Sequence, residues 1–359
     1  MSASPGRNET ARLPLAAQNG SISSLSQNLD HEVLFYSNHT FAPSTAKTYT
    51  SQKVAFFEFC SKTNTLPVPL SQNDLGRYIA FLSRRLCFNS VRQYLNVVRI
   101  MHLEAGFRNP LEDNWYVDSI LKGVKRVKGN SSTQKLPITL DILRAIAGTL
   151  DLSCSIDRVF WTVCLVAFYS FFRKSNLLLG SPESFDPSRN LCCSDVSFGA
   201  EGAVLRVRWS KVIQFRERTL EVPLPKISTH LFCPSTALLQ LCLSYKTSGN
   251  PTPLFQYKVN KTLVPLTQFK FTQKLRQCLS QLGYPAEKYS GHSFRRGGAT
   301  LALQCGLPVD LIKIQGDWNS NAYERYLQPS FGLRKKVAET LGSHTTACLQ
   351  QTELCTAQK

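Results

Sequence analysis

The sequence predicts a mainly α-helical protein with two folded domains, the second of which includes a small antiparallel sheet. Apolar residues recur at helical spacing in consecutive segments of residues 43–130 and again beyond residue 138. Residues 203–224 instead alternate apolar and polar side chains, which is typical of two or three short strands. A chain of 359 residues is long enough for two to three domains with cores of their own.

Residues 1–42 are expected to form a flexible N-terminal tail. They are rich in Ser, Asn and Gln and lack sustained helical spacing, with a short helix expected near residues 31–37. The N-terminus has no apolar segment of the kind found in signal peptides. The longest apolar stretch, residues 163–172, is too short to cross a bilayer and ends at Arg173. We therefore expect a soluble, intracellular protein without a membrane partner.

Residues 43–130 are expected to form a helical domain. Within it, the helix predicted over residues 89–106 has its apolar side chains on one face, with Arg92, Asn96 and Arg99 on the opposite face. Such a polar face suits contact with DNA phosphates and base edges, and it equally suits ordinary solvation. The other helices, each with a polar residue or a proline at its start, are predicted over residues 44–63, 71–86 and 110–129.

The helical domain is expected to end in a flexible basic linker, with the boundary near residue 130. The helix predicted over residues 71–86 also ends with two basic residues, Arg84 and Arg85. The candidate DNA-binding residues of this domain are Arg84, Arg85, Arg92, Asn96, Arg99, Lys122, Lys125, Arg126 and Lys128.

Residues 131–330 are expected to form the second domain. A helix that begins at Thr139 and a long apolar helix over residues 158–179 precede the strands. Residues 331–359 are expected to form a C-terminal helix or tail. Its apolar Leu333, Val337 and Leu341 share one stripe, which docks either on the same subunit or on a neighbouring one. After the strands, helices are predicted over residues 234–247, 267–283, 292–306, 308–316 and 320–328.

The charge balance indicates a polyanionic partner. The chain has 42 Lys and Arg against 24 Asp and Glu, a formal net charge of +18. Residues 43–130 contain 13 basic and 6 acidic residues, and residues 131–330 contain 23 and 13, so the excess lies in the predicted domains. A basic folded body favours nucleic acid as the partner over a role in solubility alone. The 12 cysteines lack zinc-binding spacing, so no metal is expected.

The densest group of chemically capable residues lies in residues 291–330. His292 and Arg295 are three apart, so on a helix they share a face and can meet one small anion. Trp318 and Tyr326 follow. Breaking a phosphodiester without a metal needs a nucleophile, cations for the pentavalent phosphate, and a proton donor for the departing oxygen. These residue types supply all three, although the stretch around His292 alone is more often a capped helix with surface arginines.

These motifs resemble those of the tyrosine recombinases, the lambda-integrase-type family of DNA strand-transfer enzymes. The order is Arg, hairpin Lys, His-x-x-Arg, Trp and Tyr, and the resemblance covers roughly residues 43–330. It is closest to the transposon-encoded branch of DIRS-type, Ngaro-type and crypton elements in eukaryotes. The resemblance implies a helical, SAM-like core-binding domain, followed by an α+β catalytic domain with a small antiparallel sheet.

The resemblance also implies a role for each site residue. Arg173 and Arg295 would grip the non-bridging oxygens of the scissile phosphate bidentately. Lys211, on a mobile hairpin, would protonate the leaving 5′ oxygen. His292 would hydrogen-bond the phosphate and assist deprotonation of the tyrosine. Trp318 takes the family's His/Trp position, with an indole N–H that only donates.

Tyr326 is the expected nucleophile. It lies eight residues after Trp318, close to the family spacing, whereas Tyr323 lies five after it and is expected to pack. Attack would give a 3′-phosphotyrosine, which stores the bond, so that ligation needs no ATP. Asn176 stands where the family commonly has an acidic residue three positions after Arg173, which indicates retuned or weakened chemistry.

The function implied by the resemblance is site-specific recombination or transposition of double-stranded DNA by a tetramer, without metal or cofactor. Two alternatives stay open. One is a catalytically silent DNA-binding protein that retains the fold, and the other is an activity like that of a type IB topoisomerase. In a eukaryotic host the protein is expected in the nucleus.

Overall fold

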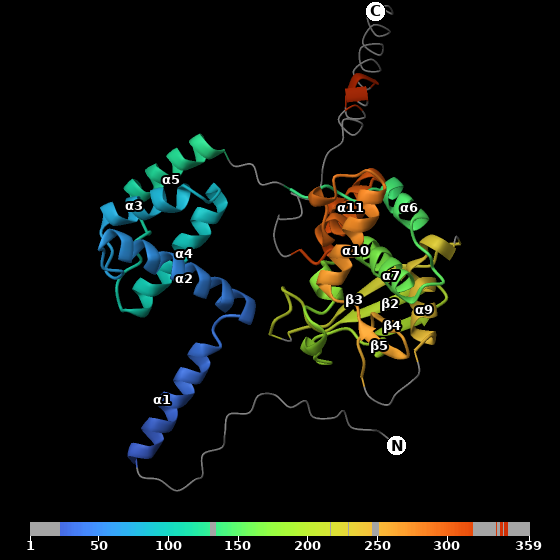
Figure 1. The fold of residues 1–359 in the computed structure, drawn as a ribbon, viewed down its shortest axis with the longest axis horizontal. Coiled ribbons are helices and arrows are strands. Elements are labelled where there is room, and N and C mark those ends of the chain that lie inside the picture. The colour runs from blue at the N-terminus through green and yellow to red at the C-terminus, as the bar shows by residue number, and fades with distance from the viewer. Residues whose placement is uncertain are drawn as a thin grey trace, which may run out of the picture. The chain divides into compact units, whose positions relative to one another are not determined.

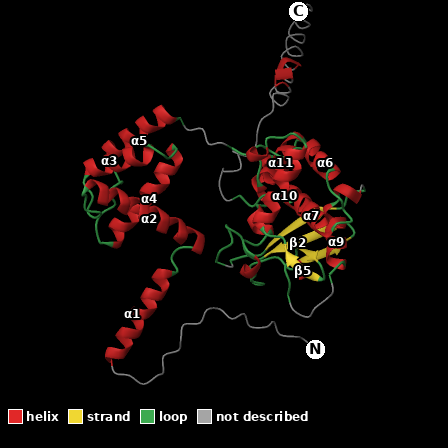
Figure 2. Ribbon diagram, viewed as in Figure 1, coloured by secondary structure: helices red, strands yellow, loops and turns green. Residues whose placement is uncertain are grey.

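The computed structural model describes residues 22–129, 134–215, 217–228, 230–245 and 251–318, together with 335, 338, 339 and 341–343. The chain divides into two compact units, Met1–Thr133 and Gln134–Lys359 (Figure 1). The described part is mainly helical with two small antiparallel sheets (Figure 2), so the predicted fold class is confirmed. No helix within these ranges is long and apolar enough to cross a membrane.

The described part of the first unit is helical. The side chains that precede two helices explain where these begin. The Ser71 hydroxyl accepts the N–H of Asp74 at 3.2 Å, and the Asn114 side-chain oxygen accepts the N–H of Val117 at 3.2 Å. The helices are α1 (Ile22–Asn38), α2 (Pro43–Thr63), α3 (Gln72–Ser83), α4 (Phe88–Glu104) and α5 (Trp115–Lys128).

Helix α1 corrects the expectation of a short helix within the N-terminal tail. It spans 17 residues. Leu25, Leu29 and Val33 recur at every fourth position, a helical spacing that the Ser-, Asn- and Gln-rich composition obscured. All three side chains are more than half exposed. Helix α1 therefore contributes little to the hydrophobic core of the first unit.

An aromatic core fixes the remaining helices of the first unit. Tyr78 packs against both Phe56 and Phe59, with ring centroids 5.0 Å apart in each pair. The buried His102 joins the loop before α3 to α4, because its Nε2 accepts the N–H of Leu70 at 2.9 Å and its Nδ1 donates to the Val98 carbonyl at 2.7 Å. These contacts fix α2, α3 and α4 relative to one another.

The second unit combines helices with two sheets. Strands β1 (Val196–Gly199), β2 (Gly202–Val207) and β3 (Leu220–Pro225) form an antiparallel sheet in that order, with Leu205 opposite Val222. A separate hairpin, β4 (Gln256–Val259) and β5 (Thr262–Pro265), was not predicted, because each strand has only four residues and too little alternation to detect.

The helices of the second unit are α6 (Leu140–Gly148), α7 (Ser155–Tyr169), α8 (Lys174–Leu177), α9 (Pro234–Leu243), α10 (Gln268–Gln281), α11 (Gly291–Gln304) and α12 (Val309–Gln315). Short 3-10 turns lie at Pro182–Ser184, Cys193–Asp195, His230–Phe232 and Ala286–Lys288.

Helix α7 is the central element of the second unit, in contact with α9, α11, β3 and β4 and buried along most of its length. The single helix expected over residues 158–179 is interrupted after Tyr169. The Ser170 hydroxyl donates to the Val166 carbonyl at 2.6 Å and accepts the N–H of Phe172 at 3.3 Å, which competes with continuation of the helix. The interruption places Arg173 at the start of α8 instead of inside a long helix.

Helix α11 packs backbone against backbone on its neighbours. A Cβ atom on Gly297 would lie 1.8 Å from the carbonyl oxygen of Ile138, and one on Gly298 would lie 2.1 Å from that of Phe168. The N–H of Ile138 donates to the Ser293 carbonyl at 2.9 Å, which holds the segment before α6 along the start of α11. The two glycines are therefore required by close approach.

We predict that Gly297→Ala lowers the free energy of unfolding by about 1–3 kcal/mol, as overpacking of a well-packed core does. Gly148→Ala is the matched control, because nothing lies within 4 Å of its Cβ position. The control should leave stability within about 0.5 kcal/mol of the unchanged protein. Urea unfolding measures both, and equal stability of the two variants would contradict the close packing of α11.

Candidate active site

The start of helix α11 carries His292 and Arg295. The Ser290 hydroxyl accepts the N–H of His292 at 3.3 Å, and the N–H of Ser290 donates to the Ser293 hydroxyl at 3.0 Å. This reciprocal cap fixes the first turn of the helix. His292 is exposed there, whereas only 1% of Arg295 is exposed. The two side chains therefore belong to one turn but differ in their access to solvent.

Arg295 is held by two hydrogen bonds and one aromatic ring. Its Nη1 donates to the Phe171 carbonyl at 2.5 Å and its Nη2 to the Gly316 carbonyl at 2.8 Å. The guanidinium carbon lies 3.8 Å from the centroid of the Trp318 ring, a cation–π contact. The two bonds use two of the five N–H donors of a guanidinium. In this structure two N–H groups of Arg295 therefore bind backbone carbonyls of the neighbouring turns.

Each of the two turns that Arg295 contacts contains one residue with a left-handed backbone conformation. Phe171 has φ 54° and Asp317 has φ 50°. Gly316 is required before Asp317, because a Cβ there would lie 1.8 Å from Trp318 Cζ3. Positive φ at a non-glycine residue costs free energy. The contacts with Arg295 offset this cost and join the turn after α7 to the turn after α12.

Arg173 and Lys174 lie at the start of α8, next to α11. Arg173 is partly exposed, and its carbonyl accepts the N–H of Asn176 at 2.9 Å. Lys174 Nζ donates to Thr272 Oγ1 at 2.9 Å, and burial, followed by the charge of Arg276, lowers its pKa. The stem of Lys174 covers Gly291, where a Cβ would lie 2.8 Å from that of Lys174. The first turn of α11 therefore approaches α8 closely.

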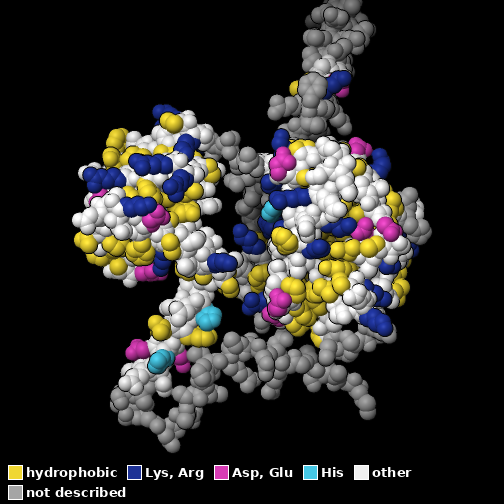
Figure 3. Space-filling view, in the orientation of Figure 1, with side chains coloured by type: hydrophobic (Ala, Val, Ile, Leu, Met, Phe, Trp, Pro, Cys, Tyr) yellow, Lys and Arg dark blue, Asp and Glu magenta, His cyan; other side chains and the backbone are white. Residues whose placement is uncertain are grey.

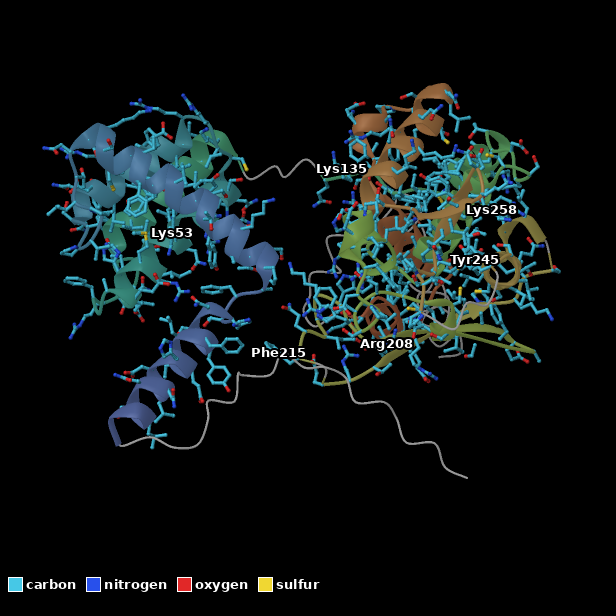
Figure 4. The ribbon with its side chains drawn as sticks, turned by 60° about the horizontal axis from the view of Figure 1, so that its bottom comes forward. Lys53, Lys135, Arg208, Phe215, Tyr245 and Lys258 are labelled. Carbon is cyan, nitrogen blue, oxygen red and sulfur yellow. The ribbon has the colours of Figure 1, made fainter. Side chains whose placement is uncertain are left out.

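Lys211 lies in a tight turn between β2 and β3. Ser210 and Ile213 flank the turn and exchange two backbone hydrogen bonds, at 3.3 and 3.2 Å. Both flanking residues are buried, at 2% and 0% exposed, whereas Lys211 is exposed. This turn therefore presents the Lys211 side chain to solvent. Phe215, 90% exposed, lies farther along the same loop, at the outer edge of the unit (Figure 4).

The environment of His292 reveals which charges the fold brings together. Part of the His292 ring reaches solvent, but the surrounding protein still desolvates the imidazole, and this is the first cause of a pKa below the ordinary value of 6.5. The positive charges of Arg173, Arg295, Lys174 and Lys211, in that order, lower the pKa further. Four cations from three separate segments are therefore close enough to act on one imidazole. A neutral imidazole at pH 7 is able to accept a proton.

Sequence reasoning missed Lys174 as a member of this cluster. Its position directly after Arg173 was the available signal, but the packing of its stem on Gly291 depends on tertiary structure. Tyr326 and Tyr323 lie outside the described residues, as do Leu333 and Val337 of the C-terminal stripe. In the described ranges, no group of three His, Cys, Asp or Glu residues could hold a metal ion.

The basic residues of the first unit gather where α3, α4 and α5 meet. Lys128 Nζ donates to the Leu86 carbonyl at 3.0 Å, and Lys125 Nζ lies 5.7 Å from the centroid of the Phe88 ring. These contacts bring the end of α5 to the α3–α4 turn. Lys and Arg side chains cluster over α3 and α5 in the space-filling view (Figure 3). Exposed members of this basic surface are Arg84, Arg85, Arg92, Lys122, Lys125, Arg126 and Lys128.

Asn96 makes side-chain contacts within the first unit. Its Nδ2 donates to the Tyr49 hydroxyl at 2.7 Å, and its Oδ1 accepts from Arg99 Nε at 3.0 Å. Asn96 and Arg99 are both partly buried. The periodicity of α4 could not reveal this, because the partner Tyr49 comes from α2.

No protein-family model and no curated protein matches the sequence. Solved structures do match. The Tn1549 transposon integrase in complex with a circular intermediate DNA has a TM-score of 0.58 at 12% identity, covering 86% of this chain and 97% of that chain. A lambda integrase dimer bound to a COC′ core site has a TM-score of 0.55 at 12% identity, covering 84% and 95%.

The XerH site-specific recombinase, in a post-cleavage complex with palindromic difH substrate, has a TM-score of 0.54 at 15% identity, covering 81% of this chain and 78% of that chain. These similarities show that the chain has the fold of tyrosine recombinases.

We predict that Lys174→Met raises the pKa of His292 toward 6.5, because the variant removes one of the charges that oppose protonation of the imidazole. Titration followed by NMR of the imidazole nitrogens measures the change. Arg144→Gln is the control, since Arg144 is an exposed α6 side chain that is absent from the charges acting on His292. A pKa that stays the same or falls in the Lys174 variant would contradict the described cluster.

Proposed function

We propose that the chain is a site-specific recombinase or transposase that cuts and rejoins double-stranded DNA through a 3′-phosphotyrosine, without metal or ATP. The observation that carries the proposal is the cluster of positive charge around His292, supplied by α8, α11 and the β2–β3 loop of a tyrosine-recombinase fold. Concentrated positive charge beside a neutral imidazole is what a pentavalent phosphate and an attacking hydroxyl require.

In this proposal each residue has a distinct task. Arg173, which is partly exposed, binds the non-bridging phosphate oxygens directly. Arg295 adds its positive charge beside the phosphate and holds the surrounding turns in place. His292 accepts the proton of the Tyr326 hydroxyl, whose ordinary pKa is near 10. Lys211 protonates the departing 5′ oxygen, which its exposed position permits.

The burial of Arg295 favours one alternative function. A guanidinium that is 1% exposed and bonded to two carbonyls is poorly placed to bind an oxyanion directly. A catalytically silent protein that binds DNA and keeps the fold would tolerate this arrangement. Covalent attachment to DNA distinguishes the two functions.

The basic surface of the first unit is the proposed site for the DNA backbone. Its side chains converge from α3, α4 and α5, so they can follow one stretch of phosphates. We further propose assembly as a tetramer on two duplexes, with residues 331–359 docked on a neighbouring subunit, and nuclear action in a eukaryotic host. Origin in a transposon-encoded branch of DIRS, Ngaro or crypton type belongs to the same proposal.

We predict that Tyr326→Phe abolishes covalent attachment to a nicked suicide substrate while DNA binding stays nearly unchanged, because only the nucleophilic oxygen is lost. Denaturing gels of labelled DNA detect the attached species. Tyr323→Phe is the matched control and should retain attachment. Attachment that survives in the Tyr326 variant would refute this assignment of the nucleophile.

We predict that Arg84→Ala combined with Lys125→Ala weakens DNA binding in a sequence-independent way and makes its salt dependence shallower. Each lost phosphate contact should reduce the slope of log K against log[salt] by about 0.9. Arg77→Ala is the control, because Asp74 already pairs with Arg77 at 3.0 Å. A slope unchanged from the starting protein would exclude this surface as the phosphate contact.

A further inference from the structure

The loop between β2 and β3 is attached to the unit at both ends. At its start, Arg208 Nη2 donates to the buried Asp195 carboxylate at 2.7 Å and to the Pro187 carbonyl at 2.9 Å. At its end, Arg218 forms an ion pair with Asp317. The turn that carries Lys211 lies between these two attachments. The start of the loop is therefore attached to the segment before β1, and its end is attached to the turn after α12.

The Arg218–Asp317 ion pair joins this loop to the surroundings of Arg295. Asp317 lies directly between Gly316, whose carbonyl accepts from Arg295, and Trp318, whose ring covers the guanidinium. The Asp317 side chain is 12% exposed and that of Arg218 is 41% exposed, so solvent screens the pair only in part. A residue of the loop thus contacts the turn that completes the positive cluster.

The second half of the loop has little else to hold it. Among its described residues 214, 215 and 217–219, Arg218 makes the polar contact that leaves the loop. Gln214 Nε2 donates back to the Lys211 carbonyl at 2.6 Å, and the N–H of Phe215 donates to Glu217 Oε2 at 3.0 Å. Both of these bonds are internal. Among these described residues, Gln214 therefore joins this half of the loop to the Lys211 turn, and Arg218 joins it to the Arg295 turn.

We infer that Arg218 and Asp317 are positioning residues that hold the Lys211 loop against the Arg295 turn, so that the lysine meets the leaving oxygen. The inference rests on the proposed function and adds a residue pair to it. A proton donor must come within hydrogen-bond reach of the departing atom, and small displacements of catalytic groups are costly in rate. Losing the pair should therefore slow the step that needs Lys211 and spare the steps that do not.

A change of leaving group isolates that step. In DNA with a 5′-bridging phosphorothiolate, cleavage expels a thiolate, whose conjugate thiol has a pKa near 8.5. The oxygen leaving group is far more basic and needs a proton as its bond to phosphorus breaks. Tyrosine attack forms the phosphotyrosine bond in both substrates, and the departing sulfur keeps its electron pair without a donor. Only the oxygen substrate depends on the position of Lys211.

The test compares Arg218→Gln and Asp317→Asn with the unchanged protein on both substrates. We expect covalent attachment to oxygen-linked DNA to slow on the order of tenfold or more. Attachment to the sulfur-linked DNA should stay within about twofold, since no donor is needed. The reversed pair, Arg218→Asp with Asp317→Arg, should recover part of the rate on oxygen-linked DNA.

Arg206→Gln is the matched control. Arg206 pairs with Glu221 at 3.4 Å across β2 and β3, in the same hairpin but away from the loop. Its loss should leave both rates unchanged. Equal slowing of Asp317→Asn on the two substrates, or no slowing on either, would overturn the inference. An unchanged protein that attaches to neither substrate would instead refute the proposed function.

The pKa of His292, measured without DNA, also reports whether Lys211 has moved. Lys211 is one of the charges that lower the pKa of His292, whereas Arg218 and Asp317 are absent from them. Displacement of the loop in Asp317→Asn should therefore raise the pKa of His292, and Arg206→Gln should leave it unchanged. A His292 pKa identical in all three proteins would show that Lys211 had not moved, and would overturn the inference.

Discussion

The burial of the Arg295 guanidinium is the constraint on which the arrangement of α7, α11 and α12 depends. Removing a guanidinium from water is expensive unless hydrogen bonds and aromatic contacts replace its hydration. Two backbone carbonyls and the Trp318 ring do so, and the carbonyls belong to turns that follow α7 and α12. Hydrogen bonds to charged groups contribute about 1.5–3 kcal/mol each. Arg295 is thus a cross-link that aligns three helices as well as a source of positive charge.

The same constraint explains the close backbone packing around α11. Gly297 and Gly298 let the helix lie directly on the Ile138 and Phe168 carbonyls. Arg296, the next residue after Arg295, donates to the Gln134 side chain at 2.6 Å, near the start of the unit. Helix α11 therefore connects the first residues of the second unit to the positive cluster. A change in the packing of α11 would therefore affect both the first residues of the second unit and the positive cluster.

The local part of the candidate site was predictable from the sequence, because it depends on residue type and spacing along one helix. His292 and Arg295 are three apart, and their helix begins at a serine that caps it. Other features depend on partners distant in the chain. Ser170 ends α7 before Arg173. The Tyr49 hydroxyl accepts a hydrogen bond from Asn96, 47 positions away, and Arg218 and Asp317 are 99 positions apart. No periodicity or motif specifies such contacts. The four-residue strands β4 and β5 were missed because they are too short to carry a pattern.

The proposed role of the charge cluster is to hold a phosphate that a tyrosine of the same chain attacks. The most direct measurement is mass spectrometry of the peptide left on DNA after a trapped complex is digested with protease. We expect a peptide containing Tyr326, joined to the 3′ phosphate of the cut strand. A peptide linked through another residue, a 5′ linkage, or site-specific binding without any linked peptide would contradict it.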